Sequence, residues 1–161
     1  MSLYMPKISP QLVYNDQAEE AARFYVSVFR NSAIMNFTYY PDNAGTFAGM
    51  VRTVSFHLDG QKMIAVNGGP SFSFSDGISL YVSCETQYEI DELWEKLSEG
   101  GIKERCGWLR DKFGVYWQIT PAIAWEMVND PDPVKAQRAM DAIDGMTKMD
   151  IETLRRAYEG S

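Results

Sequence analysis

The sequence repeats one order of elements twice, and this repetition limits the fold more than any other feature. The first half shows a strand pattern, a helical pattern and three more strand patterns, at 8–16, 17–29, 34–40, 50–58 and 62–69. The second half repeats strand and helix and continues with one strand fewer, at 78–84, 88–101, 102–109 and 115–119. Self-similarity at a spacing of about 70 residues indicates a duplicated module rather than a short-repeat solenoid.

Two modules of this kind predict an α+β fold. A single module cannot cover both faces of its sheet, so two curved sheets placed side by side, with a helix on each outer face, would leave a cleft between them. We expect residues 1–121 to form one domain of two modules, about 7–68 and 77–121, joined by the glycine- and serine-rich connector 68–77.

The remaining residues, 122–161, predict a helical C-terminal extension. Asp132 followed by Pro133 is typical of a helix start, and Asp150 with Thr153 resembles an N-terminal capping arrangement. We expect this extension to pack on the domain or on the partner chain of a homodimer.

Charge and composition exclude several classes of partner. Asp and Glu number 22 against 15 Lys and Arg, and this net charge of -7 disfavours nucleic acid. No apolar run approaches the roughly 20 residues of a membrane helix, and the N-terminus lacks the features of a secretory signal. The sequence therefore predicts a cytoplasmic protein without a membrane partner, in which Cys84 and Cys106 are free thiols.

Four segments in order resemble a known family: AEEAARFYVSVFRNS, LDGQKMIAVNGGP, CGWLRDKFGVYWQITP and DPDPVKAQRAMDAI. They are similar to PhnB-like proteins of the glyoxalase, or vicinal oxygen chelate, superfamily, in the group named for demethylubiquinone 3-methyltransferase. The resemblance implies two βαβββ modules of the glyoxalase, bleomycin-resistance and dihydroxybiphenyl-dioxygenase type. The methyltransferase name finds no support in the residues, because the glycine-rich Asn67-Gly68-Gly69-Pro70 leads into another strand and not into a helix.

The same resemblance implies a divalent metal in the cleft, held by the first and last strands of each module, with glutamate on the closing strand. The corresponding positions are Gln11, Asn67, Ser79 and Gln118, none of which carries a charge or an imidazole. First-row catalytic metals normally need two or three His, Asp or Glu ligands, and the only histidine is His57. We expect no tightly bound metal and no cofactor; the alternative is a weak or exchangeable divalent metal.

The candidate site residues predict a polar, uncharged patch in an aromatic cleft, and such a site suits a small, partly apolar, neutral ligand. The predicted ligand-binding residues are Gln11, Asn67, Ser79, Tyr81, Trp108, Tyr116 and Gln118. Because strand residues alternate, Gln118 and Tyr116 share one face and Trp117 takes the other. No catalytic residue is assigned, and the two candidates are Cys106, a nucleophile if its strand places it at the cleft, and Asp111, a carboxylate able to ligate a metal. Because no histidine is at hand to pair with it, Cys106 is interpreted as an inert thiol; Asp111 is interpreted as a turn carboxylate that accepts backbone N–H groups.

Two functions of different class follow from this site. The first is a module that binds or sequesters a small molecule, and the missing metal ligands favour it. The second is a metal-assisted lyase, isomerase or related glyoxalase-type enzyme. A homodimer built through the C-terminal helices or the sheet edges is compatible with both.

Overall fold

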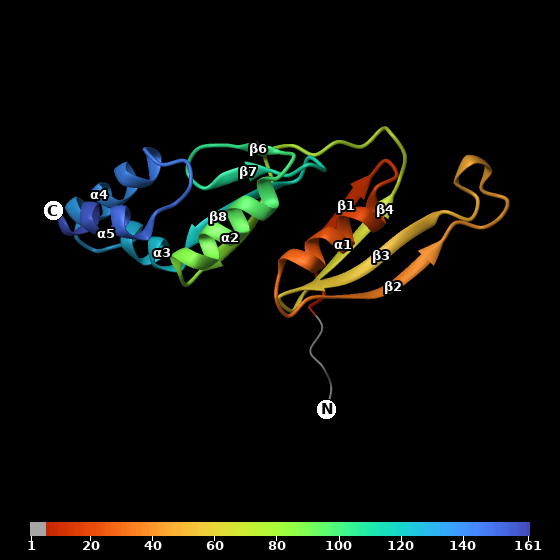
Figure 1. The fold of residues 1–161 in the computed structure, drawn as a ribbon, viewed down its shortest axis with the longest axis horizontal. Helices are drawn as coiled ribbons and strands as arrows, with labels where there is room; N and C mark the ends of the chain where they lie inside the picture. Colours follow the sequence, from red (N-terminus) through yellow and green to blue (C-terminus); the bar gives the residue numbers. More distant parts are fainter. Residues whose placement is uncertain (1–5) are drawn as a thin grey trace, which may run out of the picture. The chain divides into compact units, whose positions relative to one another are not determined.

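The computed structural model describes residues 6–161, which fall into two compact units (Figure 1). The first unit ends at Ser73 and the second begins at Phe74, so the boundary lies within the predicted connector 68–77. The second unit also contains the C-terminal helices.

The first unit is a four-stranded sheet with one helix. Its elements are β1 (Gln11–Tyr14), α1 (Ala18–Val28), β2 (Ala33–Tyr39), the short 3-10 helix η1 (Gly45–Phe47), β3 (Val51–Leu58) and β4 (Gln61–Asn67). The strand order is β1-β4-β3-β2, with β1 parallel to β4 and the other neighbours antiparallel. Asp59 and Gly60 join β3 to β4 with φ angles of 47° and 81°, the pair of left-handed residues that a type I′ hairpin turn requires.

Helix α1 packs on one face of this sheet. Val54 and Phe56 lie two residues apart on β3 and therefore share a face, and both are fully buried together with Ala21, Ala22 and Tyr25 of the helix. The small alanine side chains let the helix lie close to the strands. The rings of Tyr25 and Phe56 stack and fill the space beside them. Figure 1 shows α1 lying along the strands of this sheet.

The second unit repeats the connectivity of the first. Its sheet comprises β5 (Leu80–Cys84), β6 (Ile102–Lys103), β7 (Trp108–Arg110) and β8 (Tyr116–Pro121), and α2 (Gln87–Ser98) follows β5. In the strand order β5-β8-β7-β6, β5 is parallel to β8, as β1 is parallel to β4, and the other neighbours are antiparallel. Both halves are therefore βαβββ modules, and the predicted duplication is confirmed.

The prediction of one strand fewer in the second half was wrong. The segment 102–109, expected to be a single strand, divides into β6 and the start of β7 around a turn. Cys106 and Gly107 have φ angles of 61° and 79°, in the left-handed region that a strand does not contain. Residues with this backbone reverse the chain, so the module gains a short edge strand.

Three helices follow β8: α3 (Ala122–Val128), α4 (Pro133–Asp144) and α5 (Ile151–Glu159). The predicted helix starts are confirmed, since Asp132 accepts a hydrogen bond from Val134 N at 2.9 Å and Asp150 accepts one from Thr153 N at 2.7 Å. The three helices share a small apolar cluster centred on Ala124, Ala139 and Leu154. No helix within residues 6–161 is both long and apolar enough to cross a membrane.

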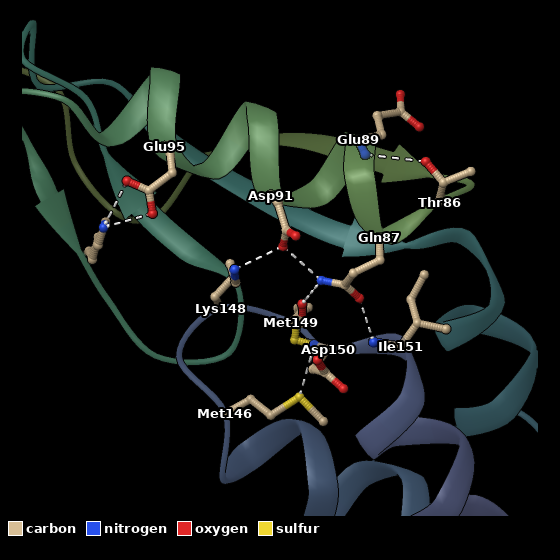
Figure 2. Close-up of polar contacts among 11 residues, drawn as sticks. Thr86, Gln87, Glu89, Asp91, Glu95, Met146, Lys148, Met149, Asp150 and Ile151 are labelled. Atoms are coloured by element: carbon tan, nitrogen blue, oxygen red, sulfur yellow. Dashed lines mark hydrogen bonds and ion pairs between the residues drawn. The ribbon is translucent and has the colours of Figure 1, made fainter.

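Gln87, the first residue of α2, joins this extension to the second module (Figure 2). Its Nε2 donates to Met149 O at 3.0 Å and to Asp91 Oδ1 at 2.9 Å, while its Oε1 accepts from Ile151 N at 2.8 Å. Lys148 Nζ lies 2.8 Å from the same Asp91 Oδ1. One amide side chain thus connects the module's helix to the segment that precedes α5 and to the first residue of α5.

The same segment also contacts the turn before β7. Cys106 N donates to Met146 O at 2.8 Å, and Gly107 N donates to Thr147 O at 2.9 Å. The side chain of Met149 is fully buried. The extension therefore packs on the second module of its own chain and supports the turn from which Trp108 emerges.

Candidate functional site

The second sheet has two different faces, and strand β8 shows the difference. Trp117 and Ile119 are 2% and 0% exposed, and they belong to the core that α2 shares with β7 and β8. Tyr116 and Gln118 alternate with them and are half-buried. The face opposite this core, called the open face below, is made by Ser79, Tyr81, Trp108, Arg110, Tyr116 and Gln118. The predicted alternation of Gln118 and Trp117 is confirmed.

A row of side chains crosses the open face through Gln118. Tyr81 of β5 and Trp108 of β7 are its register partners in the two neighbouring strands. Directly opposed residues of neighbouring strands have their Cβ atoms about 5 Å apart on the same face. Gln118 Nε2 also donates to Ser79 Oγ at 3.0 Å. The structure thus gathers Ser79, Tyr81, Trp108 and Gln118, and Tyr116 lies two residues along the same strand.

Arg110 is a residue of this face that the sequence prediction missed. It is the register partner of Tyr116 and is half-buried. The available signal was alternation, because Arg110 lies two residues after Trp108 and therefore shares its face. The prediction treated the segment as a strand ending in a turn and did not assign a face to Arg110.

The two remaining candidates, Gln11 and Asn67, belong to the first unit. Gln11 is the exposed first residue of β1, opposite Ile64. Asn67 is 3% exposed, on the side of β4 that shares the alternation of the buried Met63 and Ala65. Its Oδ1 accepts from Ala18 N at 2.8 Å and its Nδ2 donates to Val51 O at 2.9 Å. Asn67 therefore caps α1 and holds β3, and the ligand role predicted for it stays a prediction.

Asp111 has the structural role that its place in the turn predicted. The carboxylate is 2% exposed, and Oδ1 accepts from Phe113 N at 2.9 Å and Val115 N at 3.0 Å. Oδ2 accepts from Trp117 Nε1 at 2.8 Å. Three donors thus converge on one carboxylate that stabilises the hairpin between β7 and β8, on the core side of the sheet.

The two cysteines are free and do not form a disulfide. Burial, and to a smaller extent the nearby carboxylates of Glu89 and Glu85, raise the pKa of the Cys84 thiol to about 12. At neutral pH this thiol is protonated and unreactive, because the thiolate is the nucleophile. Cys106 is half-buried in the turn before β7, outside the strand in which its candidacy as a nucleophile placed it.

The donor set of the open face does not fit a first-row metal. Its polar groups are the Gln118 amide and the Ser79 hydroxyl, which bond to each other, the phenol hydroxyls of the two tyrosines, the Trp108 indole N–H and the Arg110 guanidinium, which is a cation. Within residues 6–161 no three His, Cys, Asp or Glu side chains gather in a way that suits a metal ion. His57 lies on β3 opposite Lys62, in the other unit. The open face therefore does not provide the ligands that a first-row catalytic metal requires.

Residues 6–120 match the family model described as 3-demethylubiquinone-9 3-methyltransferase. The chain belongs to this family. A PhnB protein from Bacillus cereus is 35% identical, and the match covers 72% of this chain and 98% of that one with a TM-score of 0.66. Helices α3 to α5 fall beyond the last residue of the family match.

More distant solved structures share the fold. Protein PA1353 from Pseudomonas aeruginosa is 18% identical with a TM-score of 0.61, over 73% of this chain and 98% of that one. The fosfomycin resistance protein FosX from Listeria monocytogenes, in complex with Mn(II) and 1S,2S-dihydroxypropylphosphonic acid, is 16% identical with a TM-score of 0.52, over 74% and 94%. The comparison with curated proteins gives no match. The fold is therefore that of PhnB-like proteins of the vicinal oxygen chelate superfamily.

The family's name is a description, and the chain's own backbone gives methyl transfer no support. The glycine-rich segment 67–70 leads from β4 into a loop and then to β5. Dinucleotide-type loops instead place a helix N-terminus directly after the glycines, where it binds phosphate. Each sheet has one parallel pair of strands and is otherwise antiparallel, unlike the parallel sheets in which such loops occur.

Proposed function

We propose that the chain binds a small, partly apolar molecule on the open face of the second sheet. The row formed by Tyr81, Gln118 and Trp108 carries this proposal, because it places one amide between two aromatic side chains. Aromatic rings supply a large contact area with little conformational freedom to lose, and a single polar group between them orients a ligand. The three residues come from three strands of one sheet, which is a rigid support.

The hydrogen bond between Gln118 and Ser79 supports the same role. Because Nε2 of Gln118 donates to Ser79 Oγ, the hydroxyl hydrogen of Ser79 is left to donate to a ligand. Oε1 of Gln118 remains an acceptor. The pair therefore offers one donor and one acceptor side by side, and the bond between the two side chains holds the amide in one orientation.

The proposal includes no metal-assisted reaction. The groups on the open face are an amide, a serine hydroxyl, tyrosine and tryptophan side chains and a guanidinium, and a guanidinium repels a divalent cation. The same side chains therefore favour binding of a small molecule and disfavour a metal ion at this face.

Native mass spectrometry of the purified protein, alone and with a library of small neutral and charged compounds, tests the proposal. We expect a bound compound to be lost, or weakened by about tenfold or more, in Gln118→Ala, since a neutral hydrogen bond and its partner's desolvation contribute on this scale. Gln61→Ala is the matched control, because Gln61 is an exposed amide in the β3–β4 hairpin. Equal binding by wild type and Gln118→Ala would overturn the proposal.

A further inference from the structure

We propose that the molecule bound on the open face carries an oxyanion, such as a carboxylate or phosphonate group, and that Arg110 binds this group. The inference rests on the proposed function and narrows its ligand class. The expected ligand is therefore not the neutral molecule predicted from the sequence, because that prediction did not include Arg110 among the residues of this face.

Arg110 lies within reach of the groups that would hold the rest of the ligand. It faces Tyr116 across the β7–β8 pair, and the next pair on the same face is Trp108 with Gln118. Successive residues on one face of a strand are about 7 Å apart. A molecule of a few carbon atoms can therefore contact the guanidinium at one end and the Gln118 amide at the other.

The charge of Arg110 has no protein partner in the described part of the chain. Six ion pairs occur within residues 6–161, and their basic residues are Arg23, Lys96, Lys103, Lys148, Arg155 and Arg156. The chain has more acidic than basic residues, 22 against 15, so acidic partners are not scarce. An arginine that stays unpaired in such a chain is available to an anion from outside.

Two acidic residues lie next to Arg110, and no ion pair of the described residues joins either of them to it. Asp111 follows it on the core side of the sheet, where its two oxygens accept from Phe113, Val115 and Trp117. Glu104 N donates to Trp108 O at 2.9 Å, which places Glu104 beside the neighbouring pair, and none of the ion pairs found within residues 6–161 includes Glu104. Arg110 is a half-buried residue, and neither carboxylate forms an ion pair with its guanidinium in the described part of the chain.

A guanidinium is the side chain best suited to an oxyanion. Its planar fork presents parallel N–H donors that match two oxygens of a carboxylate or phosphonate. Partial burial without a partner costs free energy, and an incoming anion that accepts these donors removes this cost. The expected ligand therefore has an anionic group at Arg110, a hydrogen-bonding group at Gln118 and Ser79, and an apolar part beside Tyr81 and Trp108.

Titration of the whole chain with three matched probes tests the inference: phenylacetate, phenylphosphonate and the neutral phenylacetamide. Binding is followed by NMR at the Arg110 Nε–H and the Trp108 indole N–H. We expect both anions to shift both signals, and Arg110→Gln to weaken anion binding by about tenfold or more, the scale of a charge-assisted hydrogen bond, with phenylacetamide unchanged. Arg30→Gln removes the same charge at an exposed site outside the sheet and is the control.

The outcomes separate this inference from the proposed function. If phenylacetamide shifts Trp108 as strongly as the anions and Arg110→Gln changes nothing, the anion inference fails and the proposed function stands. If none of the three probes shifts either signal, both proposals are contradicted. If Arg110→Gln weakens all three probes equally and lowers the urea midpoint, Arg110 is structural and the inference is overturned.

Discussion

Replacing Asp111 separates a structural carboxylate from a catalytic one. The wild-type side chain is 2% exposed and accepts from two backbone amides and from the Trp117 indole. Asp111→Ala removes all three acceptor contacts. Asp111→Asn keeps one carbonyl oxygen for the two backbone amides at the position of Oδ1, but it sets an NH₂ group against the indole N–H.

The expected losses follow from counting donors. An unsatisfied buried donor costs about 1–3 kcal/mol, and turn amides recover part of this from water, so Asp111→Ala is expected to lower the free energy of unfolding by about 4 kcal/mol. Asp111→Asn loses the one bond to Trp117, for which about 2 kcal/mol is expected. The order alanine, asparagine, wild type is the signature of a structural role.

Urea denaturation followed by tryptophan fluorescence measures these differences. Asp76→Ala is the control, because Asp76 is exposed in the connector and its loss is expected to change stability by less than about 0.5 kcal/mol. If Asp111→Ala behaves like Asp76→Ala, the argument from burial and converging donors is refuted. Normal stability with loss of ligand binding would instead give Asp111 a direct functional role.

Three further predictions concern the turn, the thiols and the joint with the extension. Gly107→Ala sets a Cβ 2.7 Å from a backbone oxygen of β8 and 3.0 Å from Met149, so we expect a larger loss of thermal stability than for Gly45→Ala, where φ is also positive and space is open; equal losses would contradict this. Cys84 is expected to resist iodoacetamide at pH 8 in the folded protein because its pKa is raised to about 12, and a label found there by mass spectrometry would refute this. Hydrogen bonds from Lys148 and then Gln87 lower the pKa of Asp91, so its carboxylate stabilises the joint above about pH 4, and this stabilisation is lost as pH falls below that value. Protection of the amides at the start of α5 from hydrogen exchange, relative to the unfolded chain at the same pH, is expected to fall from pH 6 to 3; unchanged protection would contradict this.

The module order and the face of Gln118 were predictable because they depend on local patterns. Period-two alternation alone places Gln118 opposite to Trp117, and the structure buries Trp117 and half-exposes Gln118. The hairpin at Asp59-Gly60 follows from the same kind of local signal, since these residues accept left-handed backbone.

The features that the sequence does not reveal depend on hydrogen bonds between distant parts of the chain. The hydrogen bonds of Asn67 with Ala18 and Val51 could not be predicted, because only the folded sheet brings these residues near; its ligand role stays a prediction. The turn at Cys106 replaces a strand because Met146 and Thr147 accept the N–H groups of Cys106 and Gly107. Such pairings have no local pattern, so alternation and turn signals do not reveal them. The homodimer stays a prediction.

A crystal structure of the protein with a bound compound from the mass-spectrometric screen tests the central claim most directly. The account predicts density on the open face of the second sheet, in contact with Tyr81, Trp108 and Gln118, with any oxyanion of the ligand at Arg110. Density held instead by the first unit alone, or by the C-terminal helices, would contradict it.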